Sequence, residues 1–295
     1  MGKATAQVKW CTPVVAGDSR VGVSFQKPLL ILGSCFADNI GGRMKDVGFD
    51  ALVNPLGTMY NPVSIASSLR RIESCEPFRE DECVEIGAGD GRICSFSHHT
   101  RHARVTAAEF LADANEGLRL AHEHWQRTQT LIVTLGTAWC FRHVATKKIV
   151  GNCLKRLPSE FNRFRLSESV CEVSLENIVQ MAEGRDVIFT VSPIRHMADG
   201  AHGNQLSKST LLLAADAVVQ RHGNVEYFPS YEILMDELRD YRFYADDMTH
   251  PSALAERYVF DRFMEFALPD AEVPTLQEGI KRAKRAGHRD MGGQS

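Results

Sequence analysis

Three short runs of almost continuous apolar residues, each followed by a polar or glycine-bearing turn, dominate the hydrophobic pattern of the chain. They span residues 28–32, 130–135 and 187–191. Such runs are typical of strands buried on both faces of a parallel sheet. Apolar residues at helical spacing lie between and after them, most clearly over 107–125 and 204–221. This alternation predicts an α/β fold with parallel strands and with ligand-binding loops at their carboxyl ends.

Shorter elements are predicted around this frame. The pattern predicts strands at 49–54 and 225–228, helices at 63–72, 175–182 and 252–267, and hairpins at 83–96 and 140–150. It also predicts that residues 1–27 wrap the outside and that residues 152–165 form an irregular, basic crossing. No linker and no internal repeat divides the chain. We therefore expect one domain over 1–273 and a basic, loosely ordered tail over 274–295 that ends in disorder.

Composition narrows the range of partners and settings. The 295 residues are 44% hydrophobic and carry a net charge of −3, which argues against nucleic acid or an anionic membrane as the main partner. The eight cysteines are scattered without a Cys-x-x-Cys pair, which is typical of free thiols in a reducing cytoplasm. The first residues lack the apolar core of a signal peptide. These features predict a cytoplasmic protein.

No pattern in the chain calls for a metal or a cofactor. His98, His99 and His102 lie close together, but spacings of one and three residues fit neither a helix-borne pair nor a zinc motif. We expect these histidines to be exposed or to face a substrate.

The first apolar run leads into the stretch that is richest in chemistry. Gly33 ends the strand and permits a sharp turn, and two candidate nucleophiles, Ser34 and Cys35, follow it. A helix that begins here would direct its N–H groups and its positive end toward negative charge at the nucleophile. Such a helix N-terminus is also expected to lower the pKa of a cysteine thiol.

A candidate base and its partner stand near the end of the chain. Asp247 and His250 form an Asp-x-x-His pair directly before the last predicted helix. On a turn, the carboxylate of such a pair accepts from one ring nitrogen while the other faces a nucleophile. The alternative is that Asp247 caps the helix and His250 is a surface histidine.

Several blocks of the sequence resemble a known bacterial family. Residues 33–37 read Gly-Ser-Cys-Phe-Ala, the signature for which the GSCFA family is named, and the likeness continues through blocks at 54–62, 135–139, 192–196, 203–208 and 247–252. This family is similar to a branch of the SGNH (GDSL-like) hydrolases, flavodoxin-like three-layer α/β enzymes that hydrolyse or transfer acyl esters, often on carbohydrates. The resemblance implies that Asp247 and His250 complete a triad and that Gly57 is an oxyanion donor.

Two departures from the SGNH pattern concern the reacting groups. The register of the usual Gly-Asp-Ser motif puts Cys35 at the nucleophile's position, whereas analogy of chemistry favours Ser34. Cys35 is alternatively a small buried apolar residue. In the third block an alanine, Ala138, replaces the asparagine that usually helps to bind the oxyanion, so Thr137 or the backbone of Gly136 must substitute.

The residues that would bind substrate are predicted at the same edge. Arg195 and His196 follow the third buried strand and Asn61 lies in the second block, and the three are candidates for substrate binding. Ser207 and Lys208 are weaker candidates, and Arg195 is equally expected as a structural ion-pair partner. The whole pattern predicts a hydrolase or acyltransferase that forms an acyl-enzyme on a small-molecule or carbohydrate acyl ester. The rival is a protein that binds such a ligand without catalysis.

Overall fold

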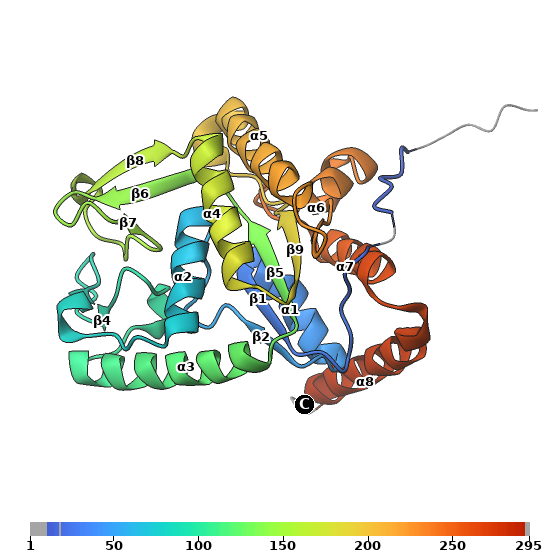
Figure 1. Cartoon of the computed structure of the whole chain (residues 1–295), viewed down its shortest axis with the longest axis horizontal. Helices are drawn as coiled ribbons and strands as arrows, with labels where there is room; N and C mark the ends of the chain where they lie inside the picture. The colour runs from blue at the N-terminus through green and yellow to red at the C-terminus, as the bar shows by residue number, and fades with distance from the viewer. Residues whose placement is uncertain (1–10, 18, 293–295) are drawn as a thin grey trace, which may run out of the picture.

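A central sheet of five parallel strands organises the protein. The computed structural model describes residues 11–17 and 19–292, with side chains as far as residue 286. The strands are β1 (Leu29–Gly33), β2 (Ala51–Val53), β5 (Thr130–Leu135), β9 (Asp186–Val191) and β10 (Val225–Tyr227). They lie in the order β10-β9-β5-β1-β2 (Figure 1). Counted along the chain this is 2-1-3-4-5, the flavodoxin-like order, and the predicted α/β fold is confirmed.

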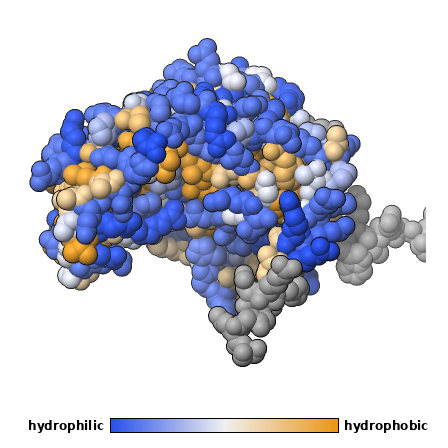
Figure 2. Space-filling model, turned by 90° about the horizontal axis from the view of Figure 1, so that it is seen from below, coloured by the Kyte–Doolittle hydropathy of each residue, from blue (hydrophilic) through white to orange (hydrophobic). Residues whose placement is uncertain are grey.

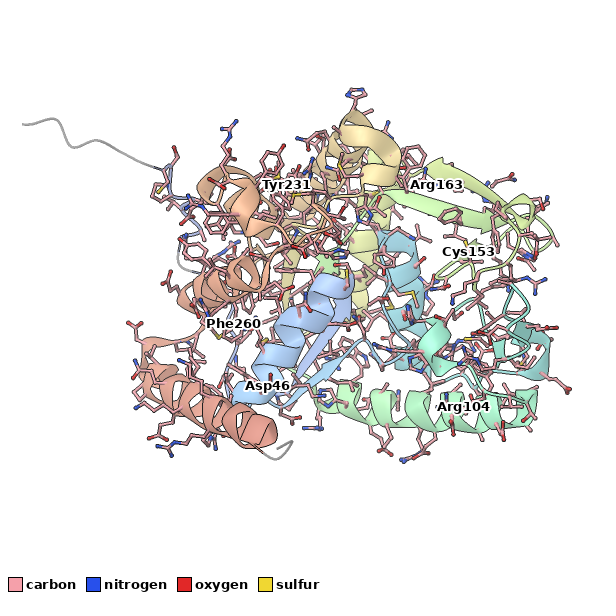
Figure 3. The ribbon with its side chains drawn as sticks, turned by 180° about the vertical axis from the view of Figure 1, so that it is seen from behind. Asp46, Arg104, Cys153, Arg163, Tyr231 and Phe260 are labelled. Carbon is pink, nitrogen blue, oxygen red and sulfur yellow. The ribbon has the colours of Figure 1, made fainter. Side chains whose placement is uncertain are left out.

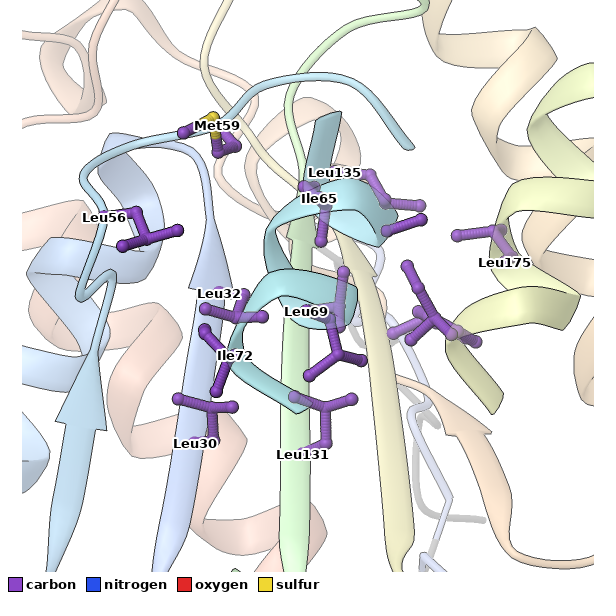
Figure 4. Packing of buried hydrophobic residues seen from close by; sticks show 14 of the residues in the cluster. Leu30, Leu32, Leu56, Met59, Ile65, Leu69, Ile72, Leu131, Leu135 and Leu175 are labelled. Carbon is purple, nitrogen blue, oxygen red and sulfur yellow. The ribbon is translucent and has the colours of Figure 1, made fainter. Parts of the chain in front are cut away.

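Helices cover both faces of the sheet and make three layers. Side chains of β1 alternate between the faces, so that Leu30 and Leu32 enter one core while Leu29 and Ile31 enter the other. The first core is covered by α2 (Pro62–Ser74), α3 (Ala107–Arg127), α4 (Glu168–Met181) and α5 (Gly200–Val219). The second is covered by α1 (Cys35–Val47) and α7 (Ala253–Ala267). Figure 4 shows apolar side chains of α2 packed against Leu30 and Leu32.

A small antiparallel sheet projects from the loop after β5 (Figure 1). It has the order β7-β6-β8, with β6 (Trp139–His143), β7 (Ile149–Val150) and β8 (Phe161–Arg165). The predicted hairpin is confirmed, but the prediction of an irregular crossing is wrong where β8 pairs with β6. The mixed apolar and basic residues of β8 show no clean alternation. Only the pairing with β6 makes it a strand, because that pairing satisfies its backbone.

The other predicted elements differ mainly at their ends. The hairpin of β3 (Val84–Glu85) and β4 (Ile93–Cys94) forms as expected. Helix α4 begins seven residues earlier than residue 175, since Ser167 accepts from the amide of Val170 and caps it. A short turn of α6 (Ser230–Glu232) follows β10.

Both ends of the described chain lie against α7 or α1. The amide of Val23 donates to the carbonyl of Ala267 over 3.0 Å, and Val21 and Val23 are buried. After α7, helix α8 (Val273–Gly292) places Leu276 in the same core as Met44 of α1. The predicted disorder falls partly on residues 293–295, which lie outside the described residues. The boundary between domain and tail at residue 273 stays a prediction.

The helices and the surface of the described part of the chain can be compared with what a membrane-crossing segment requires. No helix there is both long and apolar enough to cross a membrane. Figure 2 shows a largely hydrophilic face on which apolar side chains form small groups between polar ones.

Candidate active site

The turn after β1 brings the two candidate nucleophiles to the carboxyl edge of the sheet. Gly33 has φ 136°, and a Cβ there would lie 2.1 Å from the carbonyl oxygen of Thr134, so only glycine fits. Its amide donates to Asn54 Oδ1 over 2.8 Å, and its carbonyl accepts from the amide of Met59 over 2.8 Å. Helix α1 then begins at Cys35. Hydrogen bonds to both the amide and the carbonyl of Gly33 therefore hold the turn in place before the helix starts.

Ser34 and Cys35 point in different directions. Ser34 is 1% exposed, and its hydroxyl lies 3.0 Å from Oγ1 of Thr134 inside the sheet edge. Cys35 is half-buried, and its Sγ lies 3.8 Å from Nε2 of His250. This separation is within the range of a hydrogen bond to sulfur. Of the two candidates, Cys35 is the one in contact with His250.

Asp247 orients the ring of His250 from within a turn. One carboxylate oxygen accepts from the amides of Thr249 and His250, each over 2.9 Å. The other lies 2.6 Å from Nδ1 of His250. These amide and ring donors lower the pKa of Asp247 to about 2, so the carboxylate stays ionised and Nδ1 carries the proton. The lone pair of Nε2 then faces the sulfur of Cys35.

The thiol of Cys35 is held in its neutral form. Burial raises its pKa above the ordinary value, although the amides of Cys35 and Phe36 at the start of α1 act in the opposite direction. The prediction that the helix N-terminus lowers this pKa is wrong, because the desolvation of the sulfur outweighs the contribution of the amides. The thiol of Cys35 thus carries its proton within reach of Nε2 of His250.

The backbone amides predicted as oxyanion donors are engaged elsewhere. The amide of Gly57 donates to the carbonyl of Asn54 over 2.8 Å in a tight turn, so the expectation that it serves the oxyanion is not supported. Gly57 is needed for another reason, since with φ 100° a Cβ there would lie 2.3 Å from Cβ of His99. The amides of Gly136 and Thr137 both donate to the carbonyl of Tyr60, each over 2.9 Å.

The hydroxyl of Thr137 remains a candidate donor. Its Oγ1 accepts from the amide of Trp139 over 3.1 Å and lies 2.9 Å from Oγ of Ser207. Ser207 in turn accepts from the amide of Ala138 over 2.8 Å. If Ser207 donates to Thr137, the proton of the Thr137 hydroxyl is free for a ligand in the adjoining cavity.

A cavity of about 870 Å³ opens over this edge of the sheet and is lined by both Cys35 and His250. Arg163 of β8 and Cys153, both labelled in Figure 3, belong to the wall that the small sheet provides. Two other cavities, of about 550 and 690 Å³, contain neither Cys35 nor His250. Of these three cavities, the largest is therefore the one that Cys35 and His250 line.

The sequence matches the GSCFA family over residues 28–263. The chain belongs to the GSCFA family. No curated protein matches it. One solved structure, described as "a putative platelet activating factor from Streptococcus pneumonia", is similar with 11% sequence identity and a TM-score of 0.41. The match covers 82% of this chain and 85% of that one.

The predicted substrate-binding residues of this GSCFA protein have different surroundings. Arg195 donates to the carbonyl of Met248 over 3.3 Å, beside the His250 turn. Burial lowers the pKa of His196 to about 4, so its ring is neutral where it lines the cavity. Asn61 also lines the cavity, but its side-chain oxygen Oδ1 caps α2 by accepting from the backbone amide of Ser64 over 2.9 Å. Its position therefore has a structural explanation as well.

Lys208 has a larger part in this GSCFA site than its sequence context indicated. It is 1% exposed, and its Nζ donates to the carbonyls of Gly136 and Ser192, each over 2.7 Å. These carbonyls belong to the loops that follow β5 and β9. Burial lowers the pKa of the ammonium to about 7. The residues next to Lys208 in the sequence gave no reason to expect a buried lysine. Only the fold shows that Lys208 connects the loops after β5 and β9.

The histidine-rich segment of this GSCFA protein is not part of the cavity. His98 is 1% exposed and lies 2.7 Å from Oγ of Ser95, between the rings of Phe78 and Phe110. Burial lowers its pKa to about 3. The expectation that His98 is exposed or faces a substrate is wrong, because apolar side chains enclose it.

Proposed function

We propose that this protein is an acyl-ester hydrolase or acyltransferase in which Cys35 is the nucleophile, His250 the base and Asp247 the group that orients the base. The observation that carries the proposal is the continuous line from Cys35 Sγ to His250 Nε2, 3.8 Å, and from His250 Nδ1 to Asp247, 2.6 Å. A nucleophile, a base within reach and an oriented base are the arrangement required for acyl transfer.

The reaction proceeds in two balanced halves. In the first, Sγ attacks the ester carbonyl while the thiol proton passes to Nε2 of His250. The oxyanion then collapses, the alcohol leaves with the proton from His250, and an acyl thioester remains on Cys35. In the second half water, or a second alcohol, attacks the thioester with His250 as base and the thiol is restored. Asp247 stays ionised throughout, because its pKa is about 2.

The oxyanion requires donors other than those expected from the SGNH pattern. The amides of Cys35 and Phe36 both lie close enough to Sγ to lower the pKa of the thiol, and they stand at the first turn of α1. Together with the Thr137 hydroxyl they form the oxyanion site in this proposal. These three donors take the place of the asparagine that is missing from the third block and of the Gly57 amide, which is engaged within the protein.

We extend the proposal to kinship with the SGNH (GDSL-like) hydrolases. Three observations support it: membership of the GSCFA family, the 2-1-3-4-5 order of parallel strands, and the Asp247–His250 pair directly before α7. Since a thiol nucleophile must stay reduced, we expect the protein to work in a reducing compartment such as the cytoplasm.

The rival function is binding of an acylated or carbohydrate ligand without catalysis. The observation in its favour is that the amides of Gly57, Gly136 and Thr137 are all engaged within the protein. A site that lacks one oxyanion donor loses roughly two to three orders of magnitude in rate.

Hydrolysis of p-nitrophenyl acyl esters separates the two functions. We expect the native protein to release p-nitrophenolate and Cys35→Ala to release none above background. Cys153→Ala is the matched control, because Cys153 is a second thiol that lines the same cavity. A thioester mass increment on the native protein, absent from Cys35→Ala, identifies the intermediate. Equal turnover by the native protein and Cys35→Ala would remove Cys35 as the nucleophile, and full activity of both Cys35→Ala and Ser34→Ala would remove the acyl-enzyme mechanism.

A further inference from the structure

One wall of the cavity that Cys35 lines is built by the small antiparallel sheet. In β6 and β8, Phe141 lies opposite Arg163 and His143 lies opposite Phe161. Paired residues of an antiparallel ladder project from the same face, and alternate residues along a strand share that face. Trp139, Phe141 and Phe161 therefore project together, and all three line the cavity.

Apolar side chains continue this wall on both sides. Val150 of β7 and Pro158 lie next to it, and Ile194 lines the cavity after β9. Phe141 is 36% exposed, so a large apolar ring is left at the rim of the cavity. Concave apolar surface of this kind is typical of a binding site for an apolar group.

Two of the three arginines that line the cavity are paired with carboxylates, while the third, Arg195, donates to the carbonyl of Met248. Arg163 forms an ion pair with Asp199, and Arg156 pairs with Glu160 at 2.7 Å. The guanidinium of Arg163 also lies over the rings of Trp139 and Phe141, 4.3 and 5.7 Å from their centroids. A sugar ring needs such a face for stacking, and here the guanidinium occupies one face of each ring. The wall thus offers the remaining surface of these rings and aliphatic carbons to a ligand, without an unpaired charge from these two arginines.

From this arrangement we infer that the cavity selects esters with an aliphatic acyl chain of several carbons, which lies along Trp139, Phe141 and Phe161 while its carbonyl meets Cys35. This inference rests on the proposed function and names the acyl part of its substrate. Thr137, His196 and Thr249 line the cavity from the loops after β5 and β9 and from the turn that carries His250. Trp139, Phe141 and Phe161 lie on the small sheet. The reacting carbonyl and the chain therefore have separate surroundings.

A chain-length series tests the inference. We expect kcat/KM to rise roughly two- to fourfold for each methylene from p-nitrophenyl acetate through butyrate and hexanoate to octanoate, as burial of methylenes predicts. Phe141→Asp places a charge on the wall and is expected to reduce the octanoate-to-acetate ratio at least about tenfold. Phe141→Ser serves the same purpose if the aspartate prevents folding.

Val144→Asp is the matched control. Val144 is 37% exposed at the end of the same hairpin and does not line the cavity. The octanoate-to-acetate ratio of Val144→Asp is therefore expected to match that of the native protein. A flat chain-length profile in a protein that hydrolyses acetate would overturn the inference and leave the proposed function intact.

Binding without turnover separates the inference from the proposed function. Methyl octanoate titrated into Cys35→Ala in a calorimeter is expected to bind saturably, and Phe141→Asp in the same background is expected to weaken binding at least about tenfold. If no ester is hydrolysed but this binding is seen, the proposed catalysis fails and the apolar cavity stands. If methyl octanoate does not bind, the inference fails whatever the esters show.

Discussion

Two loops of this protein each carry a histidine, His250 or His98, and the two rings differ in their exposure and in their contacts. His250 stands on a turn with its side chain 46% exposed, has Asp247 on one nitrogen and faces the thiol of Cys35 with the other. His98 is enclosed between aromatic rings and lies against Ser95. The first ring has a second nitrogen in contact with a thiol in a cavity, while the second ring is packed between aromatic side chains and makes one hydrogen bond. Chemistry therefore follows from the surroundings of each ring and not from the number of histidines in a segment.

The largest expected difference is in catalysis. His250→Ala is expected to lower turnover of p-nitrophenyl esters by about two to four orders of magnitude, since it removes the base. The unfolding free energy is expected to change by less than about 0.5 kcal/mol, because the ring is not in the core. Steady-state kinetics and urea unfolding of the same preparation measure both. A matching fall in stability would instead make His250 a structural residue like His98.

Lys208→Met tests the link between the loops after β5 and β9. Loss of both bonds is expected to shift the Gly136 and Ser192 carbonyls and to lower turnover by about ten- to a hundredfold, because small displacements of a site are costly. Turnover within twofold of the native protein would show that the loops hold their positions without it.

The pH dependence of stability offers a second readout for Lys208. Between its folded pKa of about 7 and the ordinary value of 10.5, the folded protein has released a proton that the unfolded chain keeps. The contribution of Lys208 to the unfolding free energy therefore rises as pH increases through that window. Urea unfolding across the window is expected to show a shallower rise for Lys208→Met than for the native protein. Parallel curves would contradict the burial of a titrating lysine.

His98→Ala is the counterpart of His250→Ala. We expect it to lower the unfolding free energy by about 2 kcal/mol through loss of packing and of the Ser95 bond. Turnover measured below the unfolding transition is expected to stay near the native value. Loss of turnover without loss of stability would show that His98 takes part in catalysis, and it would contradict the structural role proposed here for His98.

Acid sensitivity sharpens the same contrast. The pKa of His98 is about 3 in the folded protein and 6.5 as an ordinary histidine. As pH falls from 6.5 toward 3, the unfolded chain binds a proton that the folded protein rejects, so stability is lost over that window. His98→Gln is expected to lose less stability between these pH values than the native protein. An identical acid profile would show that His98 is protonated without opening the core.

The smallest effect is expected from Ser34. Ser34→Ala removes the contact with Thr134 and is expected to lower the unfolding free energy by about 1 kcal/mol while turnover stays within a few-fold. Chemical unfolding and ester turnover are the measurements. A dead Ser34→Ala beside an active Cys35→Ala would return the nucleophile to Ser34.

The sequence allowed prediction of those features that depend on local pattern. The apolar runs of β1, β5 and β9 have all their side chains facing a core, apart from Asp186 at the start of β9, and each was readable as a buried strand. The turn at Gly33 and the pair of Asp247 with His250 depend on a few neighbouring residues, so the local sequence indicated both, and the resemblance to the GSCFA family added the expected role of the pair. Strand β8 was missed, since its residues become a strand only through pairing with β6.

By itself, then, the sequence determined the alternation of buried strands and helices, the turn that carries Ser34 and Cys35, and the Asp247–His250 pair, because each follows from neighbours along the chain. The tertiary structure decided the rest. It directed Ser34 inward and Cys35 toward His250, raised the pKa of the thiol by burial, engaged the Gly57 amide and enclosed His98 and Lys208. These outcomes depend on desolvation and on partners far apart in the sequence, and neither exists until the strands and helices pack together.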